Sequence, residues 1–270
     1  MQYLQMIAHR MLLATSALLL AQPPAMAGGP DLAREQRLAE QTVDAILDGE
    51  PVYLTTSDNT RFLAIEMQAD AGPHHGAAII LHGRGMHPDW TQVAAPLRTG
   101  LPSHGWSTLS LQMPVLAKDA RYYDYLPAFP AAVPRIEAGI RHLRKQGVKR
   151  IVLIAHSCSV HMSMAWVEAR GDSGIDAYIG IGMGATDYQQ PMPGPFPLEN
   201  IRVPLLAIYG SNDYPAVHRQ AAVITKKLPG LHPASAVQEI PGADHYFNDA
   251  DDALLSAVAA WLATLVTPAE

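Results

Sequence analysis

Short apolar runs alternate with longer amphipathic segments over most of this chain. Six of the runs predict β-strands: 77–81, 106–112, 151–154, 175–181, 203–209 and 237–240. Between and after them, apolar residues recur at helical spacing in 90–100, 136–146, 160–167, 217–228 and 253–265. Regular alternation of this kind predicts an α/β fold, a mostly parallel, doubly wound sheet with helices on both faces.

Two further features precede this alternation. Residues 31–47 carry apolar side chains along one side, which predicts an amphipathic helix on the outside of the domain. Residues 52–56 and 61–67 read as two strands joined by a turn at Asp58-Asn59, a plausible hairpin turn. We therefore expect an antiparallel strand pair at the edge of the parallel sheet.

Residues 1–27 resemble a secretory signal peptide. A modest basic region is followed by the apolar core 11–21, which is too short to cross a bilayer, and Ala25-Met26-Ala27 supplies a small-x-small cleavage site. We expect the mature chain, residues 28–270, to be released into the periplasm or outside the cell with no stable membrane anchor. An uncleaved N-terminal anchor is the alternative.

Composition narrows the class of partner. The 243 residues that cleavage would leave suit a single α/β domain with a substantial core. Net charge is −6 for the full chain, and the only basic cluster lies near residues 141–150, which argues against nucleic acid or an anionic membrane as the main partner. The single cysteine, Cys158, allows no internal disulfide. Nothing in the sequence indicates the oligomeric state.

A sharp turn from strand to helix is expected at Ser157. The pentapeptide Ala155-His156-Ser157-Cys158-Ser159 follows a buried strand, and small residues two positions on either side of the serine leave room for a tight turn. Such a turn holds a serine hydroxyl out at the carboxyl end of a strand, against the N-terminus of the next helix. An ordinary strand-helix junction is the alternative.

Three other strand ends carry chemically informative residues. His82-Gly83-Arg84-Gly85 is a glycine-rich turn whose backbone N–H groups can hold an oxygen that gains negative charge. Asp213 and His245 each follow a later strand. Because the carboxyl ends of parallel strands open on one cleft, these residues and Ser157 are expected to meet there. Asp244 is the alternative to Asp213 as the carboxylate that contacts His245. The side chain of a residue adjacent in sequence, however, usually points away from the imidazole ring that it precedes.

From about Val52 to Leu265 the chain resembles the α/β-hydrolase superfamily, in which an oxyanion loop, Ser, Asp and His follow one another in this order. The resemblance implies that Ser157 is the nucleophile, His245 the base and Asp213 the acid. It also implies that the backbone amides of Arg84 and Cys158 form the oxyanion hole. More narrowly, the stretches 81–90 and 105–114 resemble bacterial α/β-hydrolase-like proteins of unassigned function.

The resulting hypothesis is a serine hydrolase acting on small-molecule carboxylic esters, with no cofactor. Residues 182–200 are too few for a large cap, so we expect an open cleft for short acyl groups. Thioester, amide and deacetylation chemistry share the same attack geometry and stay open. A non-catalytic hydrolase-like binding protein of the cell envelope is the alternative. The histidines show no metal-ligand spacing with carboxylates, so no metal site is expected.

The aromatic segment 118–130 follows a predicted strand end. Loops at that end line the cleft in parallel α/β sheets, so its tyrosines are candidates for a substrate wall. A surface loop packed against itself is the competing interpretation. Cys158 is expected to be a small buried side chain beside Ser157 rather than a thiolate nucleophile.

Overall fold

The computed structural model describes residues 29–70, 72 and 74–266. The predicted signal peptide, residues 1–27, lies outside these described residues. One eight-stranded sheet runs through the described chain. Its strands are β1 (Glu50–Thr55), β2 (Arg61–Met67), β3 (Gly76–Leu81), β4 (Trp106–Leu111), β5 (Ile151–His156), β6 (Ala177–Ile181), β7 (Leu205–Gly210) and β8 (Ala236–Ile240).

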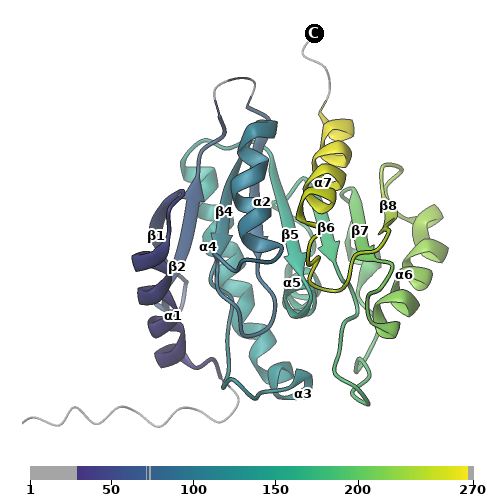
Figure 1. The fold of residues 1–270 in the computed structure, drawn as a ribbon, viewed down its shortest axis with the longest axis horizontal. Coiled ribbons are helices and arrows are strands. Elements are labelled where there is room, and N and C mark those ends of the chain that lie inside the picture. Colours follow the sequence, from purple (N-terminus) through teal and green to yellow (C-terminus); the bar gives the residue numbers. More distant parts are fainter. Residues whose placement is uncertain (1–28, 71, 73, 267–270) are drawn as a thin grey trace, which may run out of the picture.

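The strand order in the sheet is β1-β2-β4-β3-β5-β6-β7-β8. β1 with β2 and β2 with β4 are antiparallel, and every other neighbouring pair is parallel. Helices cover both faces of this sheet (Figure 1). The predicted α/β class, with a mostly parallel doubly wound sheet, is therefore confirmed.

The helices bury alternate residues of the central strands. In β5, Leu153 packs with the side chains of α4 and α5, whereas its neighbours Val152 and Ile154 pack with those of α2 and α7. β5 thus has both faces covered, as its continuous apolar run predicts. The helices of these layers are α2 (Ala94–Gly100), α4 (Val133–Lys145), α5 (Cys158–Arg170), α6 (Pro215–Lys227) and α7 (Asp251–Leu265). Four short 3-10 helices are η1 (Leu101–His104), η2 (Leu126–Ala132), η3 (Leu198–Asn200) and η4 (Leu228–Gly230).

The expected edge hairpin is present. β1 and β2 pair antiparallel from Glu50 opposite Glu66 to Thr55 opposite Arg61. Asn59 in the connecting turn has φ 65°, a left-handed conformation that asparagine tolerates better than most residues.

Two expectations about secondary structure are wrong by more than a shift of a few residues at the ends of an element. The helix expected over 90–100 starts only at Ala94, because Val93 has φ 63° and cannot continue a right-handed helix backwards. The segment 118–130, expected to be a loop, contains α3 (Tyr122–Tyr125) and most of η2. The Arg121 amide donates to the Asp124 carboxylate at 2.7 Å and caps α3. Turns this short leave no periodic apolar pattern in the sequence.

The N-terminal helix α1 (Leu32–Ala45) packs against β2 and reaches the loops at the carboxyl ends of the strands. The Arg34 guanidinium donates to the Gly85 carbonyl at 3.1 Å. Glu35 forms a buried ion pair with Arg135, 2.8 Å from oxygen to nitrogen. α1 therefore braces the glycine-rich turn after β3. Within the described residues, no helix combines the length and the apolarity that crossing a bilayer requires.

Candidate active site

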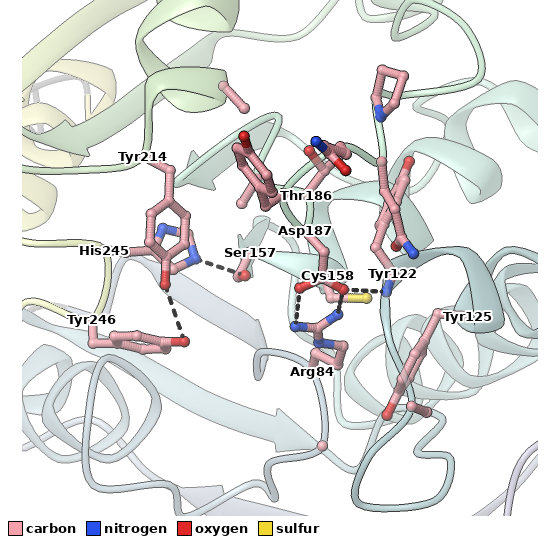
Figure 2. Close-up of a pocket in the computed structure, with 18 of the residues that line it drawn as sticks. Arg84, Tyr122, Tyr125, Ser157, Cys158, Thr186, Asp187, Tyr214, His245 and Tyr246 are labelled. Carbon is pink, nitrogen blue, oxygen red and sulfur yellow. Dashed lines mark hydrogen bonds and ion pairs between the residues drawn. The ribbon is translucent and has the colours of Figure 1, made fainter.

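Three predicted side chains meet at the carboxyl ends of three strands. Ser157 follows β5, Asp213 lies in the turn after β7, and His245 lies in the loop after β8. His245 Nε2 lies 2.8 Å from Ser157 Oγ, and His245 Nδ1 lies 2.7 Å from Asp213 Oδ1. The side chains of His245 and Asp213 are 3% and 0% exposed, so water does not compete for the bond between them. Figure 2 shows Ser157 and His245 at the edge of a pocket.

Asp244, the competing acid, faces away from the imidazole. Its Oδ1 accepts the Tyr246 amide at 2.9 Å, and its Oδ2 accepts the Asn248 side-chain amide at 2.7 Å. Asp244 thus shapes the turn that follows His245. Of the two carboxylates, the structure places Asp213 against the imidazole.

The turn at Ser157 is strained although neither usual glycine is present. Ser157 has φ 56° and ψ −119°, which a non-glycine residue adopts only when its surroundings impose it. Ala155 is fully buried in β5. Ser159 is also buried, and its hydroxyl donates to the carbonyl of His82. The residue at the second glycine position therefore ties α5 to the glycine-rich turn.

Arg84 and Cys158, whose backbone amides are the predicted oxyanion donors, both line the pocket that contains Ser157. Within the described part of the chain, neither amide donates to a protein acceptor. Buried backbone N–H groups are nearly always paired, so two free ones beside a serine hydroxyl can bind an oxygen from a ligand. His82 Nδ1 lies 2.8 Å from the Gly83 carbonyl, which helps to fix this turn.

Two residues, Gly182 and His156, constrain the position of His245. A Cβ atom on Gly182, whose φ is 64°, would lie 2.7 Å from the ring, so only glycine fits there. His156 Nε2 donates to the His245 carbonyl at 3.0 Å, and the two rings lie 5.2 Å apart between centroids. The residue before Ser157 thus links the end of β5 to the His245 loop.

Three buried histidines are held neutral by their surroundings. Burial lowers the pKa of His82 to about 3, and burial together with repulsion from His245 lowers the pKa of His156 to about 3. Burial lowers the pKa of His161 to about 4, and its Nε2 donates to the Ala185 carbonyl at 2.9 Å. None of the three can carry a proton near neutral pH without unfavourable burial of charge.

We expect stability to fall steeply as the solution is acidified. Below about pH 6.5 the unfolded chain protonates these three histidines while the folded chain does not, so unfolding takes up protons. Each histidine then contributes about 1.4 kcal/mol per pH unit. Burial raises the pKa of Glu35, which opposes the effect. Urea unfolding should show the free energy of unfolding falling by about 3 kcal/mol per pH unit between about pH 6 and pH 4.5.

A substitution at position 161 measures the contribution of one histidine to this pH dependence. Glutamine at position 161 can still donate to the Ala185 carbonyl, so His161→Gln should reduce the pH slope by about 1.4 kcal/mol per pH unit, nearly half of it. His104→Gln, at an exposed histidine, is the matched control and should leave the slope as it is. An unchanged slope in His161→Gln would contradict this account.

Cys158 is buried beside Ser157, as the sequence predicts. The side chain is 4% exposed, and burial raises the pKa of its thiol to about 12. The thiol is therefore protonated near neutral pH and is a poor nucleophile.

An ion pair crosses the pocket beside Ser157. Arg84 Nη1 and Nη2 donate to the two carboxylate oxygens of Asp187 at 2.5 and 2.8 Å, and Asp187 also accepts the Tyr122 amide at 2.6 Å (Figure 2). The Arg84 guanidinium holds the pKa of the Asp187 carboxyl below its usual value. The pair links the turn after β3, the aromatic segment and the loop after β6.

The two interpretations of segment 118–130 apply to different residues. Tyr122 and Tyr125 line the pocket, as a substrate wall requires. Phe129 instead packs inside, stacked on His161 with 5.8 Å between ring centroids. In the described residues 182–200, η3 is the only helix, and residues 185–191 form one wall of the pocket. The described residues contain no group of three or more potential ligands arranged to hold a metal ion.

Several pocket residues were not predicted from the sequence. Tyr214 and Tyr246 lie against His245, with ring centroids 4.5 and 5.2 Å from that of the imidazole. Each directly follows a predicted site residue, Asp213 or His245, and this repeated pattern was a usable signal. The sequence around Asp187 gave no such signal, because its ion-pair partner Arg84 lies 103 residues away.

Comparison with solved structures identifies the architecture. A serine hydrolase homologue from Coxiella burnetii is similar over 80% of this chain and 98% of its own, with a TM-score of 0.58 and 13% identity. An α/β serine hydrolase without lid from Xanthomonas campestris is similar over 83% and 98%, with a TM-score of 0.57 and 13% identity. The chain has the α/β-hydrolase fold. An esterase from Pyrococcus furiosus shares this hydrolase fold over 83% of this chain and 93% of its own, with a TM-score of 0.60 and 15% identity.

Comparison at the sequence level is less informative. Residues 6–133 match the model of a family described as "Protein of unknown function (DUF3530)". The match includes the glycine-rich turn 82–85 of the hydrolase fold but ends before Ser157, Asp213 and His245. Comparison with curated proteins gives no match. The expected resemblance to α/β hydrolases and to a group of unassigned function is thus confirmed. The resemblance identifies no substrate.

Proposed function

We propose that this protein is a serine hydrolase that cleaves carboxylic esters. Ser157 is the nucleophile, His245 the general base and Asp213 the acid that orients the imidazole and stabilises its cation. The amides of Arg84 and Cys158 hold the oxyanion. No metal or cofactor takes part in this scheme.

One observation carries the proposal: an unbroken chain of short contacts from Ser157 Oγ through His245 to Asp213, at 2.8 and 2.7 Å. A serine and a histidine in a purely structural role would not require the strained φ of 56° at Ser157. That strain instead holds the hydroxyl out into the pocket, where a substrate carbonyl can reach it.

The steps follow from the geometry. Ser157 Oγ attacks the acyl carbon while His245 Nε2 takes the hydroxyl proton, and the carbonyl oxygen becomes an oxyanion at the two free amides. His245 then gives the proton to the departing alcohol, which leaves an acyl-serine. A water molecule repeats the sequence, with His245 taking its proton, and releases the carboxylic acid and free Ser157.

The pocket supports short acyl groups. Its volume is about 750 Å³, and residues 185–191 border it without a covering helical cap among the described residues. The Xanthomonas relative is likewise described as lacking a lid. The Arg84–Asp187 pair occupies part of the pocket, and a long alkyl chain packed on it would remove both charges from water at a cost.

Covalent labelling tests the proposal and separates it from a non-catalytic binding protein. A fluorophosphonate reacts only with a serine whose hydroxyl is activated by a neighbouring base. We expect stoichiometric labelling, located on Ser157 by peptide mass spectrometry, and loss of p-nitrophenyl butyrate turnover in step with labelling. A folded protein that neither labels nor hydrolyses this ester would establish the binding protein instead.

We also propose that the mature protein acts in the periplasm or outside the cell. Support comes from the signal-like pattern of residues 1–27, with the small residues Ala25 and Ala27 at its end. The single cysteine forms no disulfide, so in an oxidising compartment the fold must be stabilised by packing. The buried cores on both faces of the sheet supply that packing.

A further inference from the structure

The pocket beside Ser157 has a distinctive lining. Five of the ten tyrosines in the chain border it: Tyr122, Tyr125, Tyr188, Tyr214 and Tyr246. No Leu, Ile, Val, Phe or Trp among the described residues does so, although 49% of the chain is hydrophobic. The apolar part of the wall therefore consists of flat hydroxylated rings with Ala, Pro and Met. It offers little to a flexible alkyl chain and much to a flat molecule with polar edges.

Two of these rings flank the path of the departing alcohol. In the proposed mechanism His245 Nε2 must reach the oxygen of that alcohol, so the alcohol lies on the His245 side. Tyr214 lies over the imidazole at an interplanar angle of 32°, and Tyr246 meets it edge-on at 76°. The two hydroxyls bond to one another at 3.4 Å and face the pocket (Figure 2). The alcohol therefore leaves along two rings that each end in a hydrogen-bonding group.

Planar polar groups stand on the opposite side. The Arg84–Asp187 pair is accessible, with side chains 34% and 26% exposed, and Gln189 and Gln190 line the same wall. Guanidinium, carboxylate and amide groups present paired donors or acceptors, which suit neighbouring hydroxyls. Tyr188, 89% exposed, extends from the same loop at the mouth of the pocket.

We propose that the natural substrates are short-chain O-acyl esters of saccharides, an inference that rests on the proposed hydrolase function. The C–H faces of a sugar ring pack on the tyrosine rings, and its hydroxyls bond to the tyrosine hydroxyls and the planar polar groups. Water and the O-acyl saccharide give the free sugar hydroxyl and a short carboxylic acid. The pocket thus selects the alcohol part of the ester by its hydroxyls.

Three acetates of primary alcohols provide the test: those of methyl glucoside, benzyl alcohol and n-butanol. The acyl group is the same in all three, so differences in kcat/KM report on the alcohol. We expect the glucoside acetate to be preferred by roughly tenfold or more, because a site built for hydroxyls discriminates against analogues that lack them. Equal values for the three, or a preference for benzyl acetate, would overturn the proposal.

A matched pair of variants tests the rings. Tyr188→Ala should lower kcat/KM for the glucoside acetate by about three- to tenfold and reduce its advantage over butyl acetate. Tyr53→Ala, at a 41% exposed tyrosine on the edge strand β1, is the control and should change neither value. An undiminished glucoside preference in Tyr188→Ala would count against saccharide stacking.

Binding separates this inference from the proposed function. If the wild type hydrolyses none of the three acetates and no fluorophosphonate labels it, the hydrolase proposal fails. Calorimetric titration of Ser157→Ala with the glucoside acetate then decides the saccharide proposal on its own. Binding that is weakened by Tyr188→Ala supports it, and absence of binding rejects it. If the acetates are hydrolysed without preference, only the saccharide proposal falls.

Discussion

Ser157→Ala should lower kcat for p-nitrophenyl butyrate by about a million-fold, to the level that the oxyanion amides and substrate binding alone sustain. The substitution removes the attacking oxygen, and neither His245 nor the buried thiol of Cys158 can take its place. Release from the strained φ at position 157 is not expected, because alanine meets the same steric limit there as serine. Initial rates at saturating ester, compared with thermal unfolding of the same preparation, measure the effect.

The matched control is Ser163→Ala, at a buried serine within α5. Its hydroxyl donates to the Val160 carbonyl and bonds to the Tyr178 hydroxyl, away from the pocket. Ser163→Ala should cost about 1 kcal/mol of stability and leave kcat within a few-fold of the wild type. A Ser157→Ala protein that keeps a tenth of wild-type turnover would rule out Ser157 as the nucleophile.

Asp213→Asn should lower kcat by about ten-thousandfold with little change in KM. The Tyr214 amide donates to Asp213 Oδ1 at 2.6 Å, so an asparagine would keep its oxygen at that position and still accept the His245 N–H. What is lost is the negative charge that stabilises the imidazolium in the transition state. Asp213 Oδ2 is buried without a protein donor among the described residues, so the new amide group would also lack an acceptor there.

Asp244→Asn provides the comparison for this prediction. Its carboxylate holds the turn 244–248 and does not touch the imidazole, and an asparagine retains one acceptor for the Tyr246 amide. We expect kcat to fall less than about tenfold, through slight displacement of His245. Parallel measurement of both variants distinguishes the two acids. A greater loss in Asp244→Asn would mean that the acid is wrongly assigned.

The layered fold was predictable because its signals are local. A run such as 151–154, apolar at every position, can be satisfied only where both faces of a strand are covered, and 253–265 could only be a helix at its length and spacing. The short α3 was not predictable, because it depends on one carboxylate capping one amide. The late start of α2 was not predictable either, because nothing in the sequence indicates that Val93 adopts a left-handed conformation.

The positions of Ser157, Asp213 and His245 followed from chain order and sheet geometry together. Each follows the end of a strand by no more than five residues, and parallel strands bring such residues to one edge of the sheet. The contacts that hold them are a different matter. The bond from Ser159 to the His82 carbonyl and that from His156 to the His245 carbonyl span 77 and 89 residues. Pairings of that kind arise only once the strands are in register, so no pattern in the sequence encodes them.

Helix α1 also affects the order in which the molecule can assemble. It is the first described element of the chain, yet its ion-pair partner Arg135 lies half-way along the sequence, and the Gly85 carbonyl that Arg34 binds belongs to the turn after β3. These two contacts can form only after Gly85 and Arg135 have emerged and folded, although α1 also packs against the earlier strand β2. The glycine-rich turn thus acquires the contact from Arg34 from a segment made about 50 residues before it.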